Sequence, residues 1–153
     1  MIAVIMKVMA DETVFQFMSD DHDRLDEIFS KIKEVKSTDL DQAVSLFKTF
    51  RQGLEQHIVW EEEVLFPEFE EKTGHRNSGP TEVMRQEHVM IKSHLKNIGE
   101  ILDSKSADID GEADAMLNVL KIHNDKEESI LYPMIDRLLG KKASEIVKGF
   151  RGS

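Results

Sequence analysis

Apolar residues recur along most of this chain at alternating steps of three and four, the spacing that lines up one face of an α-helix. Only 3 prolines and 8 glycines interrupt the 153 residues. No segment alternates with a period of two, so we predict no sheet. The pattern predicts four long helices over residues 11–36, 39–66, 80–104 and 110–139, and a short fifth helix over 143–150.

Residues that favour helix ends lie at most of these boundaries. Ser37 or Thr38 is expected to cap the second helix, and Asp110 the fourth. Pro80 suits the first position of the third helix, because its missing N–H has no intrahelical partner there. Gly140 is expected to end the fourth helix.

Four helices joined by short links predict an all-α fold, an antiparallel up-down four-helix bundle with a short C-terminal helix. Because proline lacks an N–H, Pro67 is expected to kink or end the second helix and Pro133 to disturb the fourth. We assign residues 11–140 to the bundle, 141–153 to the short helix and tail, and 1–10 to a disordered or additional N-terminal segment.

Polar residues interrupt the predicted inward stripes of the four helices. The stripes are Phe15-Met18-His22-Leu25-Phe29-Ile32, Leu40-Ala43-Phe47-Phe50-Leu54-His57-Glu61-Val64, Met84-His88-Ile91-Leu95-Ile98-Leu102 and Ala113-Met116-Leu120-His123-Glu127-Ile130-Met134. Counted from the connecting turns, the four histidines lie within about one helical turn of each other. Because an unpaired buried carboxylate costs several kcal/mol, protons, partner groups or a cation must neutralise this cluster.

The same polar positions belong to an internal repeat. A spacing of 66 residues separates His22 from His88, and the same spacing relates a His-x-x-x-Glu motif beginning at His57 to one beginning at His123. In each motif the His and the Glu lie on one helix face, one turn apart. The repeat therefore predicts two equivalent half-sites, each with two His and one Glu.

Composition narrows the chemistry of such a site. The absence of cysteine excludes thiolate ligands, and imidazole with carboxylate suits iron, with manganese or zinc as alternatives. A net charge of −10 argues against nucleic-acid binding. No apolar run approaches the ~20 residues needed to cross a membrane, so we expect no membrane partner. The lack of cysteine fits a reducing compartment, and we expect a cytoplasmic location.

These motifs resemble those of the hemerythrin-like family, also called the HHE cation-binding domain. The matching segments span about residues 15–139 and are Asp21-His22-Asp23, His57-x-x-x-Glu61 with Leu65-Phe66-Pro67, Glu87-His88, and His123-x-x-x-Glu127 with Leu131-Tyr132-Pro133. The resemblance implies a four-helix bundle that holds two non-haem iron ions with a bridging oxo or hydroxo group. It also implies terminal ligands His22, His57, His88 and His123, and bridging ligands Glu61 and Glu127.

Two functions follow from this resemblance. The first is binding or sensing of a small diatomic ligand, O2 or NO. The alternative is a redox enzyme or iron-handling protein that turns over peroxide or NO, or donates iron for repair of damaged iron centres. Oxygen-carrying hemerythrins have a second His four residues after His88, where this chain has Lys92. The four-His, two-Glu set is more similar to that of bacterial repair proteins, although the cysteine-containing segment usual in those proteins is absent here. The oligomeric state is left open.

Two histidines and a tyrosine fall outside the proposed ligand set. His94 is expected at the edge of the core, with a variant ligand as the alternative, and His75 is expected in an exposed loop. Tyr132 corresponds to Phe66 in the repeat, which favours a packing role, although a phenol near the metals could donate to a bound ligand.

Three further carboxylates flank the two motifs. Glu62, Glu63 and Glu128 are expected to be solvated charges, and the alternative is a hydrogen bond to a ligand His.

Overall fold

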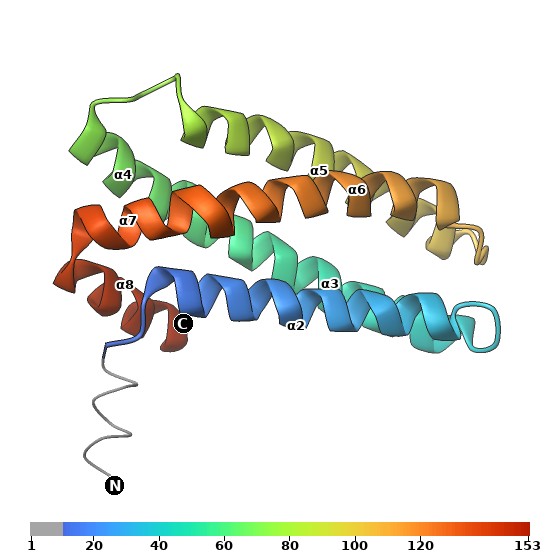
Figure 1. The fold of residues 1–153 in the computed structure, drawn as a ribbon. Coiled ribbons are helices and arrows are strands. Elements are labelled where there is room, and N and C mark those ends of the chain that lie inside the picture. The colour runs from blue at the N-terminus through green and yellow to red at the C-terminus, as the bar shows by residue number, and fades with distance from the viewer. Residues whose placement is uncertain (1–10) are drawn as a thin grey trace, which may run out of the picture.

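The computed structural model of the protein describes residues 11–153 (Figure 1). Within that range the elements are helical and no strand is present, which confirms the predicted all-α class. None of these helices is long and apolar enough to cross a bilayer. The segment assigned to residues 1–10 lies outside the described residues.

The chain folds into two antiparallel helical hairpins, α2 with α3 and α5 with α6 (Figure 1). The elements are α2 (Val14–Val35), α3 (Leu40–Trp60), η1 (Glu61–Leu65), α4 (Phe66–Thr73), α5 (Pro80–Asp103), α6 (Asp110–Lys126), η2 (Glu127–Leu131), α7 (Tyr132–Leu139) and α8 (Lys141–Arg151). α4 continues the path of α3, and α7 continues that of α6. α8 contacts α2 and α7 at the end of the bundle opposite the two hairpin turns.

Two of the predicted helix caps are wrong. The carboxylate of Asp39, and not Ser37 or Thr38, caps α3, because it accepts a hydrogen bond from the backbone N–H of Gln42 at 3.1 Å. Asp110 is the first residue inside α6, and no side chain caps that helix. An acidic residue in the first turn still interacts favourably with the positive end of the helix dipole.

The η1 and η2 segments are single turns of π-helix that begin at the two glutamates of the repeated motif. The backbone N–H of Phe66 bonds to the carbonyl oxygen of Glu61, and that of Tyr132 to the carbonyl of Glu127, five residues earlier in each case. The proline expected to disturb each helix follows one residue later. The disturbance is therefore an inserted wide turn, and the helix continues beyond it.

Each π-turn shifts the buried stripe by one residue. The predicted residues Val64, Ile130 and Met134 give way to their next neighbours Leu65, Leu131 and Ile135. Ile130 is 56% exposed, whereas Leu131 is 2% exposed. In an α-helix a step of four residues advances the side chain by about 40°, and a wider turn cancels this rotation. Leu131 and Ile135, which follow Glu127 at successive steps of four, therefore lie on the same buried face.

The start of α2 also differs from the predicted stripe. Val14 is fully buried and Phe15 is 39% exposed. Asp136 accepts hydrogen bonds from both of their backbone N–H groups, at 2.8 and 3.0 Å, which fixes the start of α2 against α7. Val14 lies about 40° from Met18 around the helix and Phe15 about 60°, so Val14 lies closer to the buried line.

The core consists of two apolar clusters with the polar positions between them. In the loop-end cluster, the members next to the polar positions are Leu25, Leu54, Ile91 and Leu120; in the α8-end cluster they are Met18, Leu65, Met84 and Leu131. Every helix of the two hairpins thus changes from apolar to polar and back at the same level. The fold thereby isolates one polar layer from water.

Candidate metal centre

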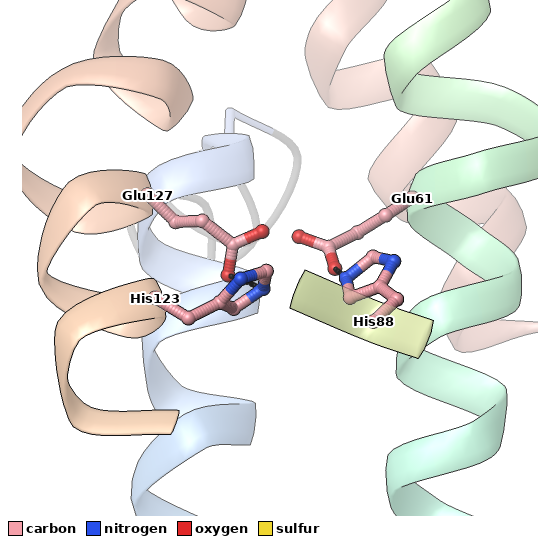
Figure 2. A group of neighbouring side chains, drawn as sticks. All are labelled: Glu61, His88, His123 and Glu127. Atoms are coloured by element: carbon pink, nitrogen blue, oxygen red, sulfur yellow. Dashed lines mark hydrogen bonds and ion pairs between the residues drawn. The ribbon is translucent and has the colours of Figure 1, made fainter. Parts of the chain in front are cut away.

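The structure brings all six predicted residues into this polar layer. Two groups of side chains each offer ligand atoms within 4.8 Å of one another: Glu61, His88, His123 and Glu127 form the first, and His22, His57 and Glu127 the second. Every one of the six is buried. Figure 2 shows the carboxylates of Glu61 and Glu127 facing each other from opposite sides of the first group.

In the first half-site, Nε2 of His88 lies 3.1 Å from Oε1 of Glu61 (Figure 2). Nε2 of His123 lies 3.3 Å from Oε1 of Glu127. Both imidazoles therefore turn the same nitrogen towards the two carboxylates.

The second half-site uses the same two carboxylates. Nε2 of His22 lies 3.2 Å from Oε1 of Glu127, and Nε2 of His57 lies 3.8 Å from Oε2 of Glu61. Each glutamate thus contacts one His of each half-site.

Two outer carboxylates hold histidines within their own hairpins. Asp21 accepts a hydrogen bond from Nδ1 of His57 at 2.8 Å, and Glu87 accepts one from Nδ1 of His123 at 2.9 Å. Both residues belong to the sequence motifs, but no role was predicted for either. The signal was available, because each precedes a predicted ligand His and the two are themselves 66 residues apart.

Two more outer carboxylates reach from one hairpin to the other. Glu62 accepts from Nδ1 of His88 at 2.6 Å, and Glu128 accepts from Nδ1 of His22 at 2.7 Å. The expectation that both would be solvated charges was wrong, because they bend towards the histidines of the opposite hairpin. Glu63 is exposed, as expected.

This outer layer sets the orientation of all four imidazoles. An Nδ1–H that donates to a carboxylate leaves the Nε2 lone pair free and increases its basicity. All four Nε2 atoms point to the interior of the polar layer, where a bound cation would replace the protons that they share with the inner carboxylates.

The hydroxyl of Tyr132 lies inside the same layer. It donates to Oε2 of Glu61 at 2.7 Å and contacts Oε1 of Glu127 at 3.0 Å. It also lies 3.3 Å from Nε2 of His22 and 3.2 Å from Nε2 of His57. The sequence favoured a packing role for Tyr132. In the structure its hydroxyl also takes part in the polar layer.

Phe66 is the counterpart of Tyr132 in the other half-site. The Phe66 ring stacks on His88 with centroids 5.9 Å apart, and the Tyr132 ring lies 5.7 Å from His22. The two rings are thus placed alike, and a single oxygen atom distinguishes the half-sites at this position.

The pKa values of the two inner carboxylates shift in opposite directions. Burial and the charge of Glu127 raise the pKa of Glu61. Burial also acts to raise the pKa of Glu127, but contacts with Glu61, His123 and His22 outweigh it and hold that pKa well below its ordinary value. One buried anion is therefore retained even without a cation.

Protonated histidines neutralise that anion. Burial opposes the charge of His22 and His123, but hydrogen bonding and Coulombic attraction to Glu127 raise the pKa of each to about 9. Burial lowers the pKa of His57, which stays neutral. A cation that enters the layer would take over the role of these protons.

The residues fit a metal ion on two grounds. Oε2 of Glu127 is buried and has no hydrogen-bond partner in the described part of the chain, which leaves an anionic oxygen unsatisfied. The inner donors are imidazole nitrogens and carboxylate oxygens, a set that suits iron, manganese or zinc. The six predicted residues can therefore bind metal, and their individual roles as ligands remain a prediction.

The other two histidines lie outside the centre, as expected. His94 is partly buried between α5 and α6, where its Nδ1 donates to Glu112 at 2.7 Å. His75 is exposed in the loop after α4.

Comparison with known proteins identifies the family of the chain. The profile of the hemerythrin HHE cation binding domain matches residues 13–135. An uncharacterized hemerythrin-like protein of Schizosaccharomyces pombe is 29% identical over 124 residues, which cover 81% of this chain and 60% of that protein. The chain thus spans less than two thirds of its relative's length. No solved structure matches it significantly. Because this profile covers most of the chain, the chain belongs to the hemerythrin HHE cation-binding family.

Proposed function

We propose that the centre binds two non-haem iron ions and uses them to bind or sense a small diatomic ligand, O2 or NO. His22 and His57 would hold one ion, His88 and His123 the other, and Glu61 and Glu127 would bridge them. The observation that carries the proposal is the duplicated, buried arrangement of four inward-facing Nε2 atoms around two shared carboxylates.

Four imidazoles and two carboxylates provide too few donors to fill two six-coordinate ions. Exchangeable positions therefore remain for solvent or a small ligand. Iron would supply redox-active, oxygen-philic chemistry at such positions.

The protein's own residues contribute orientation and exclusion of water. The four outer carboxylates fix the imidazole rings, which limits the reorganisation needed when a metal binds. The two apolar clusters cover the polar layer at both ends and restrict the entry of water. Both features favour a stable, reversible centre.

A redox or iron-handling activity is the second candidate, and the exposure of two outer carboxylates favours it. Glu62 is 30% exposed and Glu128 is 35% exposed, while each is bonded to a buried His. A carboxylate that reaches both solvent and a buried imidazole can relay protons. Turnover of peroxide or NO consumes protons, whereas reversible binding does not require them.

Titration of the anaerobically reduced, iron-loaded protein with O2 and then with NO tests the proposal. Uptake that reverses under vacuum, with two irons per chain retained, supports binding or sensing. Rapid irreversible oxidation or loss of iron supports the second candidate. Absence of stoichiometric iron, manganese or zinc contradicts both. A Glu63→Ala variant is the matched control, because this exposed residue adjoins the bridge without contacting it.

A further inference from the structure

We propose that Tyr132 is a direct ligand of one of the two ions, the one held by His22 and His57. This inference rests on the proposed metal centre. It makes that centre asymmetric, although the sequence repeat makes its His and Glu residues symmetric.

The distances around the phenol oxygen are those between neighbouring ligands of one metal ion. Metal–ligand bonds of about 2.1 Å at right angles place adjacent donor atoms about 3 Å apart. The phenol oxygen lies 3.3 and 3.2 Å from Nε2 of His22 and His57, and 2.7 and 3.0 Å from the inner carboxylates. One ion among these atoms would be within reach of all of them.

Two features distinguish this arrangement from an ordinary buried tyrosine. The hydroxyl of Tyr132 contacts four ionisable side chains at once, and the Tyr132 side chain is fully buried. A single hydrogen bond would have satisfied a packed phenol. Because the counterpart residue is Phe66, the other half-site receives no such oxygen.

The asymmetry assigns different tasks to the two ions. The His22–His57 ion would have an additional anionic oxygen donor and fewer open positions. The His88–His123 ion would keep more exchangeable positions, so the small ligand would bind there. A hard phenolate ligand also favours trivalent over divalent iron.

Binding of the Tyr132 oxygen to the metal requires no redox step. One metal–oxygen bond forms, the phenol O–H bond breaks, and the proton leaves for solvent. The phenolate charge partly neutralises the cation. The oxidation states of the metal and of the protein do not change.

Tyr132 is the single tyrosine of the chain, which makes the test specific. We expect Fe(III)-loaded protein to show a visible phenolate-to-iron charge-transfer band whose resonance Raman lines shift when the protein carries ring-deuterated tyrosine. Zn(II) loading should likewise convert the phenol ultraviolet spectrum to that of a phenolate. Both readouts use the wild-type chain and do not depend on activity.

Tyr132→Phe should bind iron and lose the band completely. Tyr132→Phe combined with Phe15→Tyr restores the tyrosine content at an exposed position and should leave the band absent. A band that survives Tyr132→Phe, returns in the double variant, or shows no isotope shift overturns the inference. If the variant does not fold, the isotope shift in the wild type decides alone.

Elemental analysis of the same samples distinguishes the role of Tyr132 from the presence of the metal centre. Two irons per chain without a phenolate signal refute the role of Tyr132 and leave the metal centre intact. A chain without bound metal overturns both.

Discussion

Nδ1 of His88 donates to a carboxylate oxygen of Glu62 at 2.6 Å, and this contact crosses from one helical hairpin to the other. Glu128 and His22 repeat it in the opposite direction at 2.7 Å. The two hairpins are thus joined at the level of the centre by buried imidazoles and outer carboxylates. Assembly of the bundle and orientation of the proposed ligands depend on the same contacts.

Glu62→Gln should weaken metal binding by about 10–100-fold, because the neutral amide no longer polarises the His88 ring. Competition with a chelator of known affinity measures the change. Glu63→Gln removes one charge from the adjacent exposed position and should bind as the wild type does. Equal weakening in both variants would show that only overall charge matters.

Glu61→Ala should abolish stoichiometric binding of two ions, because Glu61 contacts one His of each half-site. Metal content per chain after loading and gel filtration measures the effect. Glu63→Ala should retain the wild-type content. Two ions retained in the Glu61 variant would refute its role as a bridge.

Removal of metal should lower the stability of the fold. Metal that binds only the folded state contributes about 4 kcal/mol when free metal exceeds its Kd about 1,000-fold. Thermal unfolding with and without a chelator should show a clear loss of Tm in the wild type. The Glu61→Ala variant should show no chelator effect, and a chelator-independent Tm in the wild type would contradict this prediction.

Glu70 should stabilise the fold in a pH-dependent manner, independently of the metal centre. It joins α4 to α5, because it accepts a hydrogen bond from Thr81 at 2.7 Å and forms an ion pair with Arg85. The hydrogen bond from Arg85 outweighs burial and lowers the pKa of Glu70 below 4.5. The stabilisation is therefore present above pH 4.5 and lost as the pH falls through the lower folded value.

Glu70→Gln should accordingly cost about 1 kcal/mol at pH 7 and much less near pH 3, since the pair is partly exposed on the Arg85 side. Denaturant unfolding at the two pH values measures both numbers. Glu71→Gln, which changes an exposed neighbour, should have little effect at either pH. A cost for Glu70→Gln that stays constant with pH would show that the charge of Glu70 is not responsible.

The level at which the six polar residues meet could be predicted from the sequence, because it depends only on helix rise and on the distance from each turn. His22 and His88, for example, precede their turns by similar numbers of residues. The 66-residue repeat gave the same result independently. Both arguments need only the helical period and no side-chain geometry.

The one-residue shift after each glutamate could not be predicted in the same way, because the stripe assumed an unbroken α-helical period. The π-turns replace Ile130 by Leu131 in the core. A proline lies two residues after the last residue of each turn, and it was the sequence signal of this disturbance. The contacts made by long side chains could not be predicted from the sequence either. Glu128 and Glu63 have similar local sequence surroundings, yet one bends to a buried His and the other remains in solvent.

X-ray diffraction from crystals of the iron-loaded protein, with anomalous data collected at the iron absorption edge, tests the metal centre most directly. We expect two anomalous peaks per chain in the polar layer, one near Nε2 of His22 and His57 and one near Nε2 of His88 and His123. Glu61 and Glu127 should lie between the peaks. An empty polar layer in iron-replete crystals, or iron found solely at surface carboxylates, would contradict the assignment.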